Sequence, residues 1–173
     1  HNILGNLSLP SLGPDGSTIT WASTNIAAVN NSGIVTRPSF TVGDQIVTLT
    51  ATLTNGSSTT KAFTVTVKAL EQTAAEKLAA DSAWLTEAQL LNGNTAMHNI
   101  LGNLSLPVAG PDGSIITWDS TNVAAVNNSG IVTRESYTVG DQIVTLTATL
   151  ENGSTVTKAF TVTVKALEKN AAE

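Results

Sequence analysis

The sequence repeats itself within a single chain of 173 residues. Residues 1–76 align with residues 98–173 at a constant offset of 97 positions and without a gap, and 12 of the 76 paired positions differ. Self-similarity of this kind indicates two copies of one structural unit, here joined by residues 77–97. The first residue is His1, with neither an initiator Met nor a secretory leader, so we expect the chain to be a piece of a longer protein.

The differences between the copies separate predicted surface from predicted core. Polarity or size changes freely at pairs such as Thr18 with Ile115 and Ala22 with Asp119. Interiors tolerate changes in volume poorly, whereas exposed positions are usually near neutral. We therefore predict the core from apolar positions that are identical in both copies: Trp21, Leu49, Phe63 and Val65, with Trp118, Leu146, Phe160 and Val162.

Each copy has the alternating pattern of half-buried β-strands. In Gln45–Leu53 and Lys61–Lys68, apolar residues alternate with threonine and other polar residues, and Ser17–Ser23 has the same period. A further short strand is predicted around Leu7 and Leu9. Turn sequences separate these runs, above all the Asn55-Gly56 pair. Six or seven short strands in about 75 residues predict a β-sandwich.

The segment between the copies has a helical period instead. Its apolar residues lie at spacings of three, four and seven, and we expect them to pack on the sandwich that follows: Leu78, Trp84, Leu85 and Leu91. Thr73 and Glu76 form a predicted capping box. A second cap at Thr86 and Gln89 leaves two alternatives, one continuous helix or two short ones.

These patterns predict three segments. The first repeat is residues 1–72, without a helix of its own, and the helical connector of the second repeat is residues 73–97. Residues 98–173 form the second repeat and end, at Asn170, with the start of a further connector. The predicted fold class is mainly β, with two tandem sandwiches joined by a helical connector.

Composition and motifs argue against several functions. Only 12% of residues are charged and the net charge is −5, which is unlike a basic nucleic-acid binder. There is no cysteine, so disulfides and Cys-based zinc sites are excluded. The two histidines, His1 and His98, are one repeat position, and His98 has no carboxylate beside it in sequence. We therefore expect no catalysis by this chain and no membrane insertion.

Two weaker possibilities concern ligands. Calcium prefers six to eight oxygen ligands, and the candidates are turn aspartates without a ligand ladder: Asp15, Asp44, Asp112 and Asp141. Single turn aspartates more often bond to their own backbone, so no cofactor is expected. Carbohydrate binding needs exposed rings, and only Phe40 and Tyr137 are candidates, because the paired Trp residues are in phase with the core.

Several strings resemble the bacterial immunoglobulin-like domains, within the group called atrophied. They lie at Asn103–Pro107, Gly113–Asn122, Gly130–Arg134, Val144–Thr149 and Lys158–Val164. The first copy carries much the same set from Asn6 to Val67, but departs from it with Ala22 where the pattern has Asp. The resemblance implies a compact Ig-like sandwich without shared catalytic residues. It also implies a secreted or surface-attached bacterial protein, in which such repeats occur beside glycoside hydrolases, surface-layer anchoring repeats or adhesive modules.

We expect a structural function: spacer or stalk repeats that position neighbouring modules of the same polypeptide at the bacterial cell surface. An alternative is an adhesive or carbohydrate-binding module that contacts cell-wall polysaccharide. A third possibility is a subunit repeat of an extracellular assembly, in which neighbouring copies touch.

Overall fold

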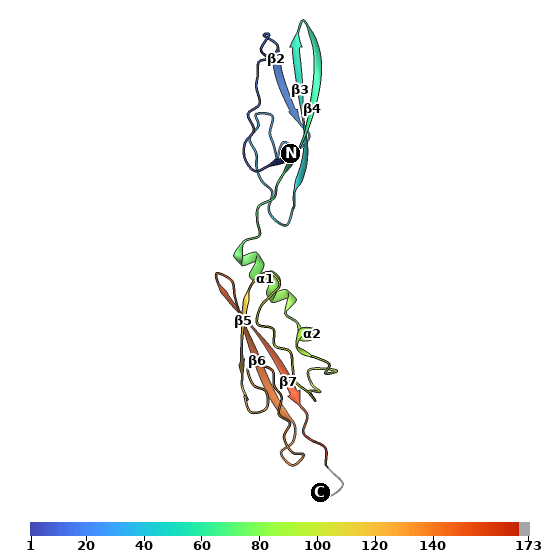
Figure 1. Ribbon diagram of the computed structural model, residues 1–173, viewed down its shortest axis with the longest axis vertical. Coiled ribbons are helices and arrows are strands. Elements are labelled where there is room, and N and C mark those ends of the chain that lie inside the picture. The colour runs from blue at the N-terminus through green and yellow to red at the C-terminus, as the bar shows by residue number, and fades with distance from the viewer. Residues whose placement is uncertain (170–173) are drawn as a thin grey trace. The chain divides into compact units, whose positions relative to one another are not determined.

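The computed structural model describes residues 1–169 and divides the chain into two compact units, His1–Gln72 and Thr73–Glu173 (Figure 1). The connector therefore belongs to unit 2. Each unit contains one β-sheet, and the predicted mainly β fold class is confirmed. The further connector predicted to begin at Asn170 lies outside the described residues.

Unit 1 contains a four-stranded sheet in the order β1-β4-β3-β2. Its strands are β1 (Asn2–Ile3), β2 (Thr18–Ser23), β3 (Gln45–Asn55) and β4 (Ser57–Val67). The long β3–β4 hairpin turns at Gly56, whose φ of 74° is the left-handed conformation that an Asn-Gly turn supplies without steric cost. Alternation then places Val47, Leu49 and Ala51 on the buried face and threonines on the other.

Unit 2 begins with two helices and continues with the corresponding sheet, in the order β5-β6-β7. Its elements are α1 (Ala74–Trp84), α2 (Glu87–Leu90), β5 (Ile115–Ser120), β6 (Gln142–Glu151) and β7 (Thr155–Val164). The counterpart of β1 is a single parallel bridge between Ile100 and Val164. The register of β6 on β7 repeats that of β3 on β4, for example Leu146 opposite Phe160 and Leu49 opposite Phe63.

The second layer of each unit is largely irregular, which corrects the expectation of six or seven strands. The segment around Leu7 and Leu9 is not a strand, because a single backbone bond, from Leu7 N–H to the Gly33 carbonyl at 2.8 Å, links it to the next loop. The Asn6 side chain replaces a further ladder bond by accepting from Val35 N–H at 2.8 Å. Single backbone hydrogen bonds and side-chain hydrogen bonds thus satisfy the backbone polar groups that a second regular β-sheet would pair in a complete sandwich.

The cores of the two units differ although their sequences nearly match. In unit 2 all four predicted core residues are buried, and in unit 1 Leu49 and Val65 are buried. Phe63, however, is 40% exposed and Trp21 is half-buried, in contrast to the prediction. The physical reason is that the connector helices cover Phe160 and Trp118 in unit 2 and have no counterpart among the described residues of unit 1.

Candidate functional site: the connector latch and the exit network

The connector is two helices because both predicted caps form. The Thr73 hydroxyl accepts from Glu76 N–H at 3.2 Å, while the Glu76 carboxylate accepts from Thr73 N–H at 2.8 Å. Two hydrogen bonds that the Glu76 carboxylate accepts from Thr73, first from the backbone N–H and then from the hydroxyl, lower the pKa of Glu76. Gln89 accepts in the same way from Thr86 N–H at 2.8 Å, so α2 starts afresh with two residues, Leu85 and Thr86, between it and α1.

The apolar side of the connector completes the second layer of unit 2. Leu78 and Leu85 of the predicted stripe are buried, and Trp84 and Leu91 are half-buried against the same cluster. Leu90, which the single-helix period leaves out, is fully buried because the break at Leu85 changes the phase of the stripe. The helix α1 lies against β6 and β7 (Figure 1).

A buried carboxylate fastens α1 to the turn before β5. Asp81 is fully buried, and its Oδ1 and Oδ2 accept hydrogen bonds from Asp112 N–H and Ser114 N–H, both at 2.8 Å. Gly110 makes room for it, since a Cβ there would lie 2.3 Å from the Asp81 Cγ. We call Asp81, Gly110, Asp112 and Ser114 the connector latch.

The latch holds Asp81 in its charged form. Burial pushes the pKa of Asp81 upward, but the hydrogen bonds from Ser114 and Asp112 together outweigh it and leave the pKa below its ordinary value. The helical period of the connector predicts no contact for Asp81, although the residue lies in a lead-in that is similar to the family. The sequence does contain a signal for Asp81: it lies three residues after Leu78 and four before Leu85, within the apolar stripe of the connector. A carboxylate at a buried position needs hydrogen-bond donors around it.

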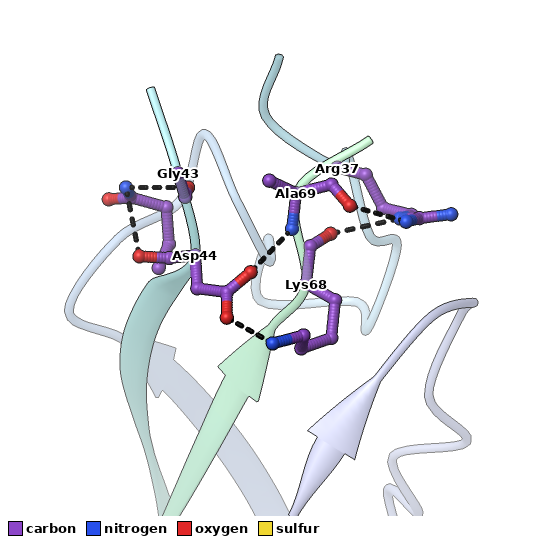
Figure 2. A network of polar contacts seen from close by, with 6 residues as sticks. Arg37, Gly43, Asp44, Lys68 and Ala69 are labelled. Atoms are coloured by element: carbon purple, nitrogen blue, oxygen red, sulfur yellow. Dashed lines mark hydrogen bonds and ion pairs between the residues drawn. The ribbon is translucent and has the colours of Figure 1, made fainter. Parts of the chain in front are cut away.

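The last strand of each unit ends in a polar network, shown for unit 1 in Figure 2. The Arg37 guanidinium donates to the carbonyls of Lys68, at 2.9 Å, and Ala69. The Asp44 carboxylate accepts from Ala69 N–H at 2.9 Å and forms an ion pair with Lys68. We call Arg37, Asp44, Lys68 and Ala69 the exit network, because they fix the backbone where it leaves β4.

Unit 2 repeats this exit network with Arg134, Asp141, Lys165 and Ala166. Arg134 donates to the Lys165 and Ala166 carbonyls at 2.8 Å and 2.6 Å, and Asp141 accepts from Ala166 N–H at 2.8 Å. In both units the lysine hydrogen bond, followed by the backbone N–H, lowers the pKa of the aspartate. Backbone bonds from Leu70 to Pro38 and from Leu167 to Glu135 continue the attachment.

The four calcium candidates do not converge in either unit. The Asp44 and Asp141 carboxylates each contact a lysine ammonium and a backbone N–H. The Asp112 backbone N–H donates a hydrogen bond to Asp81. Asp15 is an exposed turn residue. Within residues 1–169, no group of three or more His, Asp or Glu side chains is arranged to hold a metal ion.

The aromatic candidates are likewise dispersed. The Trp21 and Trp118 indole N–H groups donate to the carbonyls of Pro10 and Pro107 at 2.9 Å and 2.8 Å. Phe40 and Tyr137 are 49% and 37% exposed, one ring in each unit. A shallow groove of about 520 Å³ runs between α1 and β7, lined by Leu78, Val156, Lys158 and small residues of α1.

A family profile described as the atrophied bacterial Ig domain matches residues 1–70 and again residues 78–167. The chain belongs to this family. The second atrophied Ig domain match begins inside α1 and includes the latch, whereas the first covers a repeat without a preceding helix in this sequence. No curated protein sequence matches the chain significantly.

Solved structures similar to this pair of atrophied Ig domains include cadherin repeats of low identity. Mouse cadherin-23 EC22-24 is 14% identical with a TM-score of 0.47, covering 98% of this chain and 63% of that one. Mouse clustered PcdhgC3 EC1-3 is 10% identical with a TM-score of 0.46, covering 96% and 63%. The chain thus spans less than two thirds of either structure. Neither α1 nor α2, within the described part, is long and apolar enough to cross a membrane.

Proposed function

We propose that this chain is a pair of non-catalytic spacer repeats in a modular extracellular bacterial protein. Membership of the atrophied bacterial Ig domain family supports the structural class. The side chains of Asp81, Asp44 and Asp141 are engaged in the latch and the exit networks, where they hold backbone. The absence of cysteine is compatible with export, since these units fold without disulfides.

The observation that carries the proposal is the duplicated exit network. In unit 1 it fastens Lys68 and Ala69, four residues before Thr73 caps α1. The chain therefore leaves the sheet at a fixed point and enters the next helix after a short interval. A repeat that controls where its chain leaves is suited to carrying force or setting spacing between modules.

Pulling the chain by its two ends tests this function. We expect two separate unfolding events. Fully extended, residues 1–72 of unit 1 span up to roughly 250 Å, and the described residues 73–169 of unit 2 span up to roughly 340 Å. Arg37→Ala removes two anchors of the exit network and lowers the unfolding force of unit 1 only. The matched variant Arg134→Ala lowers that of unit 2. Extension without force peaks, or peaks indifferent to both variants, contradicts the proposal.

The alternative, an adhesive module, is favoured by apolar side chains that are exposed at the same positions of both units. Ile46 and Ile143 are 73% and 72% exposed, on the threonine face of each sheet. A glycan array and a cell-wall pull-down with the double variant Ile46→Lys, Ile143→Lys as control separate the two functions. Binding that the double variant loses supports adhesion, whereas absence of binding in both proteins supports the spacer.

A further inference from the structure

The buried faces of the two hairpins, β3–β4 and β6–β7, differ in exposure only at one half. Near the exit network, Val47 and Val67 are as buried as Val144 and Val164. At the other half the copies diverge: Phe63 is 40% exposed and Phe160 6%, while Leu53 is half-buried and Leu150 fully buried. Trp21 and Ile19 differ from Trp118 and Ile116 in the same direction. This half is the one that the connector helices cover in unit 2.

The polar part of the latch is also present in unit 1, without its carboxylate. The turn before β2 has the geometry of its counterpart, with Gly13 N–H donating to the Ser17 carbonyl at 2.7 Å as Gly110 N–H does to Ser114 at 2.8 Å. No acceptor among residues 1–169 bonds to the N–H groups of Asp15 and Ser17, the counterparts of Asp112 and Ser114. Gly13 keeps the same space free of a side chain.

A third feature is a lysine that reaches the end of the helix. In unit 2 the Lys158 ammonium donates to the Ser82 carbonyl at 3.0 Å, in the last turn of α1. Its counterpart Lys61 is exposed and lies 5.4 Å from the centre of the Phe63 ring. Unit 1 therefore offers a carboxylate cradle, an apolar floor and a cation to a helix of connector geometry. One position at this face differs between the copies: unit 1 has Thr59 where unit 2 has Val156, so one edge of the unit 1 site is more polar.

We propose that this open face of unit 1 (Asp15, Ser17, Ile19, Leu53, Lys61 and Phe63) binds a connector-type helix carried directly ahead of His1. The helix presents one carboxylate to the Asp15 and Ser17 amides and its apolar stripe to Phe63 and Leu53. Residues 73–97 occupy this relation to His98 in unit 2. Two convergent N–H groups beside an apolar floor select an amphipathic helix with one buried acid over a purely apolar segment.

The test extends the present chain by a second copy of residues 73–97 joined to His1. We expect amide exchange at Asp15 and Ser17 to slow by roughly tenfold or more, as a hydrogen bond to a buried carboxylate implies. The unfolding midpoint of unit 1 rises in the same protein. Unchanged exchange at both amides, with an unchanged midpoint, overturns the proposal.

Two variants show whether the latch itself acts. Changing the aspartate of the added helix to Asn removes most of the protection, and Gly13→Ala blocks the cradle as a Cβ at Gly110 would block Asp81. Gly5→Ala is the matched control, because a Cβ there meets nothing within 4 Å. If Gly13→Ala leaves the gain from the added helix intact, the proposed docking geometry is wrong. Mixing the unextended chain with a peptide of residues 73–97 distinguishes docking within one chain from capture between chains. If the separate peptide at micromolar concentration protects the Asp15 and Ser17 amides, the proposal that the helix must be joined to His1 is wrong.

Discussion

At the residue scale, Gly110 and Gly13 occupy the same place in the two repeats but have different neighbours. A Cβ atom on Gly110 would stand 2.3 Å from the Asp81 Cγ, whereas one on Gly13 meets nothing closer than the Ser17 Cβ at 3.4 Å. Neither glycine has a positive φ, so space alone decides the effect of a methyl group.

We predict that Gly110→Ala destabilises unit 2 by about 2–4 kcal/mol, because the carboxylate must leave its two donors or the helix must shift. Gly13→Ala changes the stability of unit 1 by less than about 0.5 kcal/mol. Urea unfolding followed by the amide signals of each unit measures both. Equal effects of the two variants would contradict the latch geometry.

The Asp81 carboxylate should also give unit 2 a dependence on acid. The pKa of Asp81 is lowered in the folded state. Below a pH of about 4, the Asp81 carboxylate is therefore protonated more readily in the unfolded chain than in the folded unit. The stabilisation is complete above that pH and is lost as the pH falls through the folded pKa.

Asp81→Asn is therefore expected to cost unit 2 about 2 kcal/mol at neutral pH, and the gap to the unchanged protein should narrow in acid. A Trp21→Phe background leaves Trp84 and Trp118 as the fluorescent reporters of unit 2. Asp119→Asn, at an exposed position of β5, is the control. A gap that stays constant from neutral pH to acid would contradict the assignment of the charge.

At the scale of elements, the connector is part of the sandwich that it precedes. Leu85 is fully buried in the same cluster as Leu146 and Phe160, so the helix supplies apolar surface that a second regular sheet would otherwise supply. Leu101, in contrast, is 52% exposed.

We expect Leu85→Ala to destabilise unit 2 by about 2–5 kcal/mol, the usual range for a buried leucine, and to leave unit 1 unchanged. Leu101→Ala, the matched exposed leucine, should cost less than about 1 kcal/mol. Thermal unfolding monitored in the Trp21→Phe background reports the difference. Similar losses from both variants would mean that the connector is only a tether.

Much of this organisation could be predicted from sequence, because alternation and caps are local signals. The expected strand Gln45–Leu53 is extended by two residues in the structure, and both predicted caps, at Thr73 and Thr86, form. The strand expected at Leu7 and Leu9 does not form, since its partner bonds come from a side chain and a loop distant in sequence. Identity with Phe160 predicts a core position for Phe63, but burial depends on what covers a position as well as on its residue type.

At the scale of the whole molecule, two nearly identical sequences provide an internal comparison of stability. Each unit has its own apolar cluster, and the cluster of unit 1 lacks the contribution of helices. A domain of about 72 residues buries only about 60% of its unfolded surface, so partial exposure of Phe63 and Leu53 removes a substantial share of its stabilisation.

Calorimetry of the full chain should therefore show two transitions, the lower one belonging to unit 1. A difference of 1 kcal/mol corresponds to about 4–8 °C for domains of this size, which is readily resolved. Exchange of the amides paired between β3 and β4 assigns the lower transition, and those between β6 and β7 the upper one. If unit 2 melted first, the latch and the buried leucines of the connector would not make unit 2 more stable than unit 1, and the prediction would be wrong. A single transition that moves with both Leu49→Ala and Leu146→Ala would instead mean that the two clusters unfold together.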